Sequence, residues 1–416
     1  MKIIHLSYSD IRGGAARATY RIHCALRNQN IDSKMLVNKS KLNDSNILRP
    51  SNKIEKIFTE LRPRITKYLL VKYLKTGNPI IHSPSFLPSS WINYINNSDN
   101  DIVHLHWVQG ELISIADIAK IKKPIVWTVQ DMWIFCGAEH YTEDYRWREG
   151  YLDNNRPSHE SGFDLNRWTW KRKKKHWKQP IQIVAPSRWL AECITNSKLL
   201  SRWPTSIIPN TINTDFWIPI DKKTARQKLN LPIDKKIILF GAIEGEKDPR
   251  KGFDLLKKSL EYLKNNLSNS DIELVVFGKS RKKLDSKFSF SSHYMGHIDD
   301  DEYLRLLYCS SDLVLIPSKQ DNLPNVGLEA HACAIPIVAY NVGGLSDIIE
   351  HKNTGYLAKP FIIEDFARGI NWVLENNLSL NLGKNARKKA MTIFSEKIIS
   401  KAYMNIYNQV LKDKTK

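Results

Sequence analysis

The stretch IPSKQDNLPNVGLEAHACAIPIVAYNVGGLSDII, residues 316–349, decides the fold. It starts where the apolar run 313–316 stops at a proline, which predicts a buried strand that ends in a loop. A helix follows from Pro324, which suits a first helical turn because no N–H is needed there. Residues 335–339 predict a second buried strand, and a glycine pair at 343–344 ends it. Strand, loop, helix and strand form a βαβ unit of a parallel sheet.

Two carboxylates fall at the strand-end loops of this unit, where parallel sheets bind ligands. Asp321 lies in the loop and Glu329 in the helix, with seven residues between them. The helix N-terminus at 324–326 offers free backbone N–H groups to an anion. The arrangement suits a ligand with hydroxyls at one end and phosphate in the middle. The same residues also fit a loop Asp that caps its helix and a Glu on a solvated face, and both interpretations stay open.

The stretch resembles the donor-site signature of retaining glycosyltransferases of family 4, in which two acidic residues flank seven others before EAxAxGxP. Asp321 stands where that family usually has Glu, and Ala334 where it usually has Gly. The resemblance implies that Asp321 holds hydroxyls of the transferred sugar and Glu329 the ribose of the nucleotide. The positions that match the signature are Glu329, Ala330, Ala332 and Pro336. The expected donor contacts between the two acids are Asn322, Leu323, Pro324, Asn325 and Val326.

The bulk composition predicts a soluble chain of two or three domains. It has 416 residues, of which 42% are hydrophobic, and no segment reads as a membrane span or a signal peptide. Five scattered cysteines without a CxxC pair argue against a zinc site or a disulfide framework, so we expect a reduced, cytoplasmic protein. The net charge of +20 implies an anionic partner, and twelve tryptophans suit a bilayer interface as well as a polynucleotide.

The first strand, at 2–7, leads into Gly13 and Gly14 and then a helix. This is a Rossmann-like opening without GxGxxG, which argues against a nicotinamide cofactor. Small residues allow a ligand to approach the backbone, although a tight turn for packing alone fits as well. In the family that the chain resembles, such a loop faces the transferred sugar and its diphosphate.

Residues 51–77 predict a basic amphipathic helical segment that Pro63 interrupts. We expect its apolar side to pack on its own domain, with an anionic membrane surface as the alternative. The apolar positions are Ile54, Ile57, Phe58, Leu61, Ile65, Tyr68, Leu69 and Tyr73.

Two further strands, in DIVHLHW (101–107) and at 124–129, end in polar residues. The same glycosyltransferases carry DxxHxH and TxHD at the matching strand ends, which meet the acceptor and the transferred sugar. The resemblance thus gives His106 a catalytic contact and makes Gln130 a donor contact. Gln130 replaces the family's His with a side chain that cannot titrate, so we expect no general acid or base chemistry there. WTVQDMWIFCGAEHY also resembles a stretch of a bacterial polysaccharide branch of the family.

The strongest charge run is RWTWKRKKKHWK, residues 167–178, which Pro180 ends. It fits a solvated helix face with tryptophans turned inward, and equally a patch that meets lipid head groups or a lipid diphosphate. Nucleic acid is not expected, because no RNP, zinc-finger or helix-turn-helix pattern accompanies the run. The residues of this expected membrane or acceptor patch are Trp168, Trp170, Lys171, Arg172, Lys173, Lys174 and Lys175.

The second domain is expected to follow IPN (208–210), with a boundary near Trp217. Arg250 and Lys251 stand in a loop before a helix, where paired cations can grip a diphosphate or simply be solvated. The family carries its diphosphate-binding Lys in a KG pair like Lys251-Gly252. Its usual Arg after the strand glycine is Ala242 here, so Arg250 or Lys247 substitutes. In the family, two strand ends like those at Gly278 and Ile298 cradle the nucleobase.

The order of these landmarks covers nearly the whole chain and implies the GT-B fold, two Rossmann-like domains with parallel sheets facing each other across a cleft. We expect domains at 1–217 and 218–394, and a helix at 395–416 that crosses back to the first. The implied activity is retaining transfer from a nucleoside-diphosphate sugar to a saccharide acceptor, expected to be lipid-linked, in bacterial surface polysaccharide biosynthesis (lipopolysaccharide, O-antigen or capsule). No cofactor or metal is expected, and the protein would sit peripherally on the inner face of the cytoplasmic membrane. The alternatives are a nucleotide-sugar 2-epimerase-like enzyme and an inactive donor-binding protein.

Overall fold

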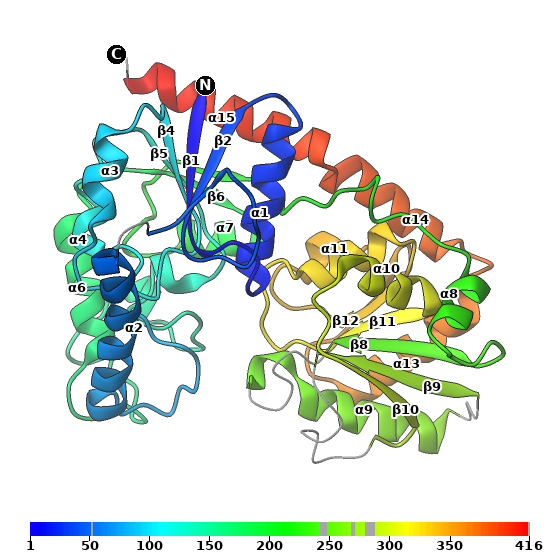
Figure 1. The fold of residues 1–416 in the computed structure, drawn as a ribbon. Coiled ribbons are helices and arrows are strands. Elements are labelled where there is room, and N and C mark those ends of the chain that lie inside the picture. Colours follow the sequence, from blue (N-terminus) through cyan, green and yellow to red (C-terminus); the bar gives the residue numbers. More distant parts are fainter. Residues whose placement is uncertain (51–52, 242–247, 268–270, 279–287, 415–416) are drawn as a thin grey trace. The chain divides into compact units, whose positions relative to one another are not determined.

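The computed structural model describes residues 1–50, 53–241, 248–267, 271–278 and 288–414. The chain divides into two compact units. The first comprises residues 1–209 and 399–416, and the second comprises residues 210–398. Each unit is a parallel sheet covered by helices (Figure 1). The expected pair of Rossmann-like α/β domains is therefore confirmed.

The sheet of the first unit has the order β3-β2-β1-β4-β5-β6-β7, and all its pairings are parallel. The strand order runs outward from β1 toward both edges of the sheet. The place beside β1 where this order reverses is the switch point where such sheets bind ligands. The strands are β1 (Lys2–Ser9), β2 (Asp32–Lys39), β3 (Ile47–Leu48), β4 (Ile102–Leu105), β5 (Ile125–Thr128), β6 (Gln182–Ala185) and β7 (Thr205–Ile207). The helices include α1 (Gly14–Arg27), α2 (Lys53–Tyr73), α3 (Trp91–Asn97), α4 (Ile115–Ile118), α5 (Arg146–Glu149), α6 (Leu165–His176) and α7 (Arg188–Thr195).

The sheet of the second unit has the order β10-β9-β8-β11-β12-β13 and is also parallel throughout. The predicted βαβ unit is present as β11, α11 and β12, with the two strands paired side by side. The strands are β8 (Lys236–Gly241), β9 (Ile272–Phe277), β10 (Ser291–Gly296), β11 (Leu313–Ile316), β12 (Ile337–Tyr340) and β13 (Gly355–Ala358). The helices include α8 (Lys222–Lys228), η3 (Pro249–Lys251), α9 (Phe253–Asn266), α10 (Asp301–Ser310), α11 (Asn325–Ala332), α12 (Leu345–Ile348), α13 (Ile363–Asn376) and α14 (Leu382–Lys389).

Two local features differ from the expectations. The first unit ends at Pro209 rather than near Trp217, because Trp217 is buried in a core of the second unit beside Tyr308. Pro63 does not interrupt the segment around it, since α2 runs unbroken from Lys53 to Tyr73. Ala242 and Lys247 lie outside the described residues. None of the described helices is long and apolar enough to cross a bilayer.

The last helix, α15 (Glu396–Lys414), lays two tyrosines against the strands of the first unit. A hydrogen bond of 2.7 Å joins the Tyr407 hydroxyl to His104 Nδ1, and one of 2.9 Å joins the Tyr403 hydroxyl to Thr128. His104 lies in β4 and Thr128 ends β5, so the helix holds both strands near their C-terminal ends. The position of these two strands therefore depends on the end of the chain.

We expect Tyr407→Phe to destabilise the first unit by about 1–3 kcal/mol, because it leaves a buried ring nitrogen of His104 without its partner. Urea unfolding followed by tryptophan fluorescence measures this, since ten of the twelve tryptophans lie in residues 1–209. Tyr94→Phe is the matched control, because Tyr94 is 43% exposed. Equal unfolding midpoints for the two variants would show that α15 does not depend on this bond.

Candidate functional site

A cation and a carboxylate meet at the C-terminal edge of the second sheet. Lys251 ends η3, which follows β8, and Asp321 lies in the loop after the neighbouring strand β11. The distance from Lys251 Nζ to Asp321 Oδ2 is 2.7 Å, and Ser318 Oγ donates to the same oxygen at 3.1 Å. Asp321 is 7% exposed, whereas the Lys251 side chain is 41% exposed. The structure thus brings together two residues that the sequence places seventy positions apart.

The electrostatics of this pair keep Asp321 ionised. Burial by itself would raise the pKa of the Asp321 carboxyl, but the charge and hydrogen bond of Lys251 outweigh burial and hold the pKa below its ordinary value of 3.8. The carboxylate therefore compensates the charge of Lys251. Because the Lys251 side chain is 41% exposed and its ammonium has three N–H donors, an anion can reach it beside Asp321 or take its place.

Two glycines allow the loop that carries Asp321 to lie against its neighbours. Gly252 has a φ of 63°, and a Cβ there would lie 1.9 Å from the carbonyl oxygen of Pro317. Gly343 has a φ of 55°, and a Cβ there would lie 2.0 Å from the carbonyl oxygen of Asp321. No side chain fits at either place, so the KG pair and the glycine pair position the loop from both sides.

Arg250 is held by its own loop. Its guanidinium donates to the Asp248 carboxylate from Nε at 3.1 Å and from Nη2 at 2.6 Å. Its carbonyl oxygen accepts from the N–H of Lys319 at 2.6 Å. Because Asp248 already compensates its charge, Arg250 is less suited than Lys251 to bind an anion.

The residues that follow Asp321 form the first turn of α11 and the wall behind it. Glu329 is buried, and its Oε2 accepts from the Tyr308 hydroxyl at 2.7 Å. Asn322 and Leu323 are buried, and Pro324 is the N-cap of the helix that starts with Asn325 and Val326. The N–H of Gly327 in this first turn donates to the carbonyl oxygen of Pro324 at 3.0 Å, and the positive end of the helix dipole there favours a negative ligand.

Gly278 and Ile298 lie on the side of β8 opposite to β11. Gly278 follows β9, has a φ of 101° and donates its N–H to the carbonyl of Gly296 at 2.5 Å. Ile298 is partly buried and packs against a core of the second unit. Neither contacts the pair of Lys251 and Asp321 in the residues described, so the expected nucleobase contacts and phosphate contacts lie on different strands.

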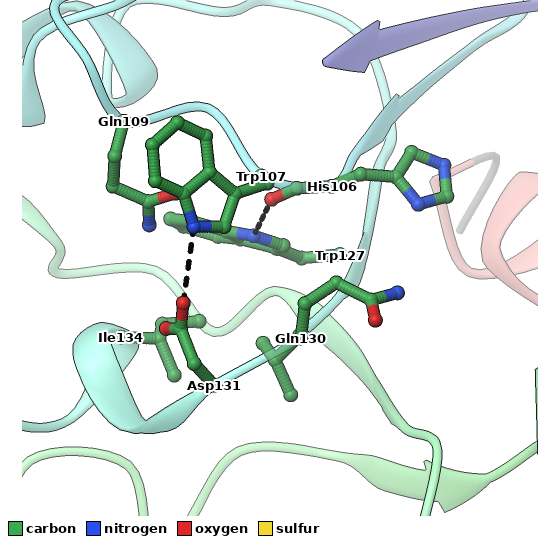
Figure 2. A pocket seen from close by; sticks show the side chains of 8 residues that line it. His106, Trp107, Gln109, Trp127, Gln130, Asp131 and Ile134 are labelled. Atoms are coloured by element: carbon green, nitrogen blue, oxygen red, sulfur yellow. Dashed lines mark hydrogen bonds between the residues drawn. The ribbon is translucent and has the colours of Figure 1, made fainter. Parts of the chain in front are cut away.

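The first unit has a pocket where β4 and β5 end (Figure 2). The space of this shallow pocket, counted together with the open solvent at its mouth, is about 180 Å³. Inside it the indole N–H of Trp107 donates to Asp131 at 3.1 Å, and Figure 2 shows the side chains of His106 and Gln130 extending to the same side. The lining residues are His106, Trp107, Gln109, Trp127, Val129, Gln130, Asp131 and Ile134.

Asp131 belongs to a hydrogen-bonded chain that the sequence did not single out. Its Oδ2 lies 2.6 Å from His140 Nδ1, and His140 Nε2 lies 2.9 Å from Ser83 Oγ. Burial would raise the pKa of Asp131, but His140 and the N–H groups of Trp107 and Trp133 hold it below its ordinary value. The sequence signal for this chain of hydrogen bonds is in WTVQDMWIFCGAEHY, where Asp131 comes shortly after a strand and His140 comes nine residues later.

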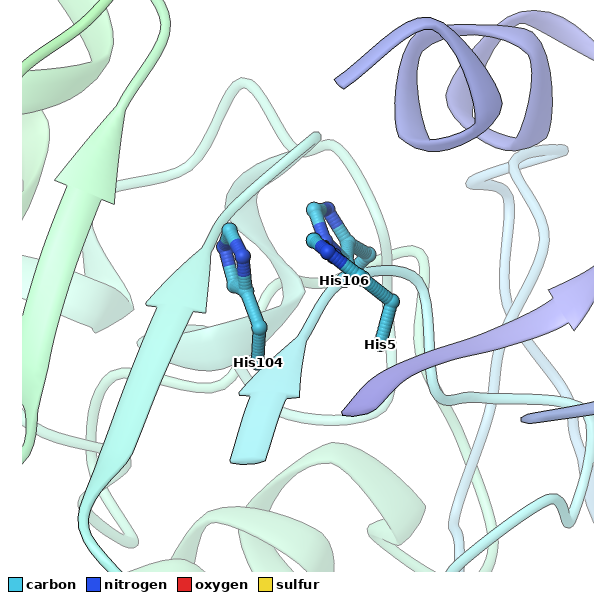
Figure 3. Close-up of side chains that lie close together, drawn as sticks. All are labelled: His5, His104 and His106. Carbon is cyan, nitrogen blue, oxygen red and sulfur yellow. The ribbon is translucent and has the colours of Figure 1, made fainter. Parts of the chain in front are cut away.

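His106 lies in a cluster with His5 and His104 (Figure 3). It is 1% exposed, and its Nε2 lies 2.9 Å from His5 Nδ1. Burial lowers the pKa of His106 to about 3 and that of His104 and His5 well below 6.5, so all three rings are neutral at pH 7. The ring nitrogens lie within 4.8 Å of one another, but both nitrogens of His104 already bond Tyr407 and Thr128. His104 therefore has no nitrogen left for a metal ion, whereas His5 Nε2 and His106 Nδ1 are buried without a hydrogen-bond partner in the described part of the chain.

Only some residues of the expected patch on α6 are exposed to solvent. Lys173 is fully buried, and its ammonium donates to the carbonyl oxygens of Trp133, Cys136 and Gly137. Trp170 is buried as well, since the helix turns these side chains toward the core. The expectation was wrong for these two residues.

The remaining members of the patch divide into two kinds. Lys171, Lys174 and Lys175 are exposed. Arg172 is half-buried and donates to the carbonyl oxygens of Pro84 and Ser85, at 2.9 and 3.3 Å, with its guanidinium over the half-buried Trp168 ring. The run is therefore a structural helix with one solvated basic face.

Gly13 and Gly14 begin α1 beside β1, the strand next to the switch point. Gly13 has a φ of 94°, and a Cβ there would meet nothing within 4 Å. The residue is thus required for its backbone conformation, and the space around it is open.

Comparisons with known proteins show a family match within the second unit. Residues 221–389 match the family described as Glycosyl transferases group 1. A Campylobacter jejuni relative, N,N'-diacetylbacillosaminyl-diphospho-undecaprenol alpha-1,3-N-acetylgalactosaminyltransferase, is 29% identical over 49% of this chain and 53% of its own length. The matches span from 28% to 60% of the length of such curated relatives.

Two solved structures share the fold over nearly the whole chain. Sucrose-phosphate synthase from Thermosynechococcus elongatus has a TM-score of 0.70 at 18% identity and covers 99% of this chain and 100% of its own. HepE from Anabaena, solved with UDP-glucose, has a TM-score of 0.64 at 14% identity and covers 98% of this chain and 100% of its own. The expected GT-B fold is confirmed, and residues 221–389, which match the group 1 glycosyl transferase family, lie in the second unit.

We expect Lys173→Met to destabilise the first unit by about 3 kcal/mol, because it leaves three buried carbonyl groups without a donor. Lys175→Met, an exposed lysine of the same helix, is the control and should change stability by less than about 0.5 kcal/mol. Urea unfolding followed by tryptophan fluorescence measures both. Similar losses for the two variants would contradict the role given to the Lys173 ammonium.

We also expect the first unit to lose stability as the pH falls below about 6.5. The folded pKa of His106 is about 3, so the unfolded chain binds the proton first, and the stability that is present above 6.5 is lost as the pH falls toward the folded value. Each buried histidine contributes a slope of up to about 1.4 kcal/mol per pH unit. Unfolding free energies between pH 7.5 and 5 measure the slope, which should be shallower in His106→Gln; an unchanged slope would contradict this.

Proposed function

We propose that this chain, whose second unit matches the group 1 glycosyl transferases, is a retaining hexosyltransferase. It moves a sugar from a nucleoside-diphosphate sugar to a saccharide acceptor linked to a lipid diphosphate. The observation that carries the proposal is the contact of 2.7 Å between Lys251 and Asp321. It puts a cation for the diphosphate and a carboxylate for sugar hydroxyls at one sheet edge, beside the first turn of a helix.

In the proposed reaction the bond between the anomeric carbon and the diphosphate oxygen breaks, and negative charge develops on the leaving group. Lys251 and the N–H groups at the start of α11 stabilise that charge because they are already oriented before the reaction. The acceptor hydroxyl forms its bond to the anomeric carbon on the same face. Its proton passes to the leaving diphosphate oxygen, so configuration is retained and no protein base is needed.

The ion pair of Lys251 and Asp321 changes partners when the donor binds. A donor diphosphate draws Lys251 away from Asp321, and the released carboxylate accepts hydrogen bonds from hydroxyls of the sugar. Arg250 contributes only a background field, because it stays paired with Asp248. Glu329, oriented by Tyr308, holds the ribose.

We propose the remaining donor and acceptor contacts from the positions of other residues in each unit. Gly278 and Ile298 cradle the base through backbone groups, and Gly13 and Gly14 offer N–H groups to the sugar or its diphosphate. The pocket of Trp107 and Asp131 takes acceptor hydroxyls, because Asp131 is a buried carboxylate at its wall.

General acid or base chemistry is not assigned to the first unit. Gln130 cannot titrate, and the buried His106 is held neutral and weakly basic by its low pKa. We propose that the reaction takes no metal or cofactor, since Lys251 and the helix N-terminus supply the positive charge.

We place the reaction in the building of a bacterial surface polysaccharide, such as lipopolysaccharide O-antigen or capsule, at the cytoplasmic face of the membrane. The name of the Campylobacter jejuni relative includes a diphospho-undecaprenol acceptor, which supports a lipid-linked acceptor here. The net charge of +20 suits both a lipid diphosphate and an anionic membrane.

The test is hydrolysis of the donor. The pure protein is incubated with UDP-, GDP-, ADP- and dTDP-sugars, with and without EDTA, and release of the nucleoside diphosphate is followed. Release from one donor, unchanged by EDTA, is expected. Free epimerised sugar would indicate a 2-epimerase-like enzyme, and donor binding without turnover, even with lipid-linked acceptors present, would indicate an inactive donor-binding protein.

We expect Lys251→Ala to lower kcat with the active donor by about 10²–10³, because it removes a preorganised charge from the leaving group. Glu329→Ala should act mainly on donor affinity and raise KM. Lys319→Ala is the control, since Lys319 lies in the loop that carries Asp321 but pairs with Asp254 at 2.9 Å. Normal turnover in both Lys251→Ala and Glu329→Ala would show that the site is assigned wrongly.

A further inference from the structure

Helix α2, the blue helix so labelled in Figure 1, presents an apolar stripe to solvent. The side chains of the stripe follow helical spacing over about 21 Å of the helix. Their exposure is high, at 67% for Ile54, 57% for Phe58 and 65% for Tyr68. We call the set Ile54, Ile57, Phe58, Leu61, Ile65 and Tyr68 the outer stripe.

The buried face of the same helix is polar. Arg62 donates to the carbonyl oxygens of Pro88 and Glu111, at 3.0 and 3.5 Å, and Thr66 donates to the Glu111 carboxylate at 3.1 Å. Thr59 is the third buried residue of the helix. The expectation that the apolar side packs on its own domain was therefore wrong: polar bonds orient the helix and leave the outer stripe outside.

Positive charge borders the outer stripe. Only Glu60 is an exposed acid on this helix, and it pairs with Arg64 at 3.2 Å. Arg172 of α6 also interacts with Glu111, so the base of α2 lies near the helix that carries the exposed Lys171, Lys174 and Lys175. The exposed basic residues of α2 are Lys53, Lys56, Arg64, Lys67 and Lys72.

We propose that α2 is a membrane-docking helix whose outer stripe inserts into the interface of an anionic phospholipid bilayer. An apolar stripe between basic residues is the pattern of a helix that lies in the interface plane, with its apolar side a few ångströms below the head groups. Each basic residue near an anionic leaflet adds about 1 kcal/mol, and Tyr68 suits the boundary between head groups and chains.

The charge and the chemistry of the face argue against other occupants. A second copy would bring two basic helices together, and their like charges would repel. A nucleic acid could meet the charges, but it would leave the aliphatic side chains Ile54, Ile57 and Leu61 without an apolar partner. Lipid meets both requirements at once.

The inference gains its biological sense from the proposed lipid-linked acceptor, but its test does not depend on transfer. The full chain is sedimented with vesicles of phosphatidylcholine and with vesicles that also contain phosphatidylglycerol. We expect binding to the anionic vesicles, weakened by salt. Phe58→Ser with Tyr68→Ser should weaken it about tenfold, and Lys56→Gln with Lys67→Gln should weaken it on anionic vesicles only.

The controls are Leu378→Ser, at an 88% exposed apolar residue of the second unit, and Lys257→Gln, at an exposed lysine of α9 in the second unit. Both should bind like the original protein, and all variants should keep its circular dichroism and donor hydrolysis. Full vesicle binding by Phe58→Ser with Tyr68→Ser would overturn the proposal. Self-association that this variant abolishes would assign the stripe to a second copy, and preferential binding of single-stranded RNA would assign it to nucleic acid; either result, without vesicle binding, overturns it too.

Discussion

All the strands in both sheets of the described chain run parallel, and this constraint decides where chemistry can be placed. Parallel strands end at the same edge, so the loops that follow them gather there whatever their distance in sequence. In the second unit, this constraint brings Lys251 beside Asp321. In the first unit, it brings His106 and Asp131 into one pocket wall. Sheet topology therefore brings the residues of both candidate sites together, whatever side chains the loops carry.

A second feature of this protein is that nearby groups compensate the charge of its basic side chains. Although the net charge is +20, several basic side chains have close polar or acidic partners. Lys173 is surrounded by three carbonyl oxygens, and Arg250 is paired with Asp248. The pair of Lys251 and Asp321 differs because its lysine stays 41% exposed. A ligand can therefore exchange partners there, whereas the buried lysine on α6 can only be structural.

Helix α2 shows how side-chain hydrogen bonds outweigh apolar burial in choosing a face. An apolar stripe normally turns to the core, because each buried aliphatic side chain contributes about 1.5–3 kcal/mol. Here Arg62 and Thr66 bind Glu111, which is itself buried and would be costly to leave without partners. The apolar pattern alone carries no information about that glutamate, so the orientation of α2 was not predictable from periodicity.

The amino-acid sequence by itself determined the βαβ unit at 313–340 and the edge at which Asp321 and Lys251 lie, because apolar periodicity and glycine turns are local signals. The two parallel α/β domains were implied by the resemblance that the order of the motifs carries. Tertiary structure alone decided that Lys173 and Trp170 turn inward, that Asp131, His140 and Ser83 form one chain of hydrogen bonds, and that Tyr403 and Tyr407 hold the strands of the first unit. The physical reason is the same in each case. These side chains are placed by partners far away in sequence, and the free energy of burying a polar group depends on whether such a partner is within reach.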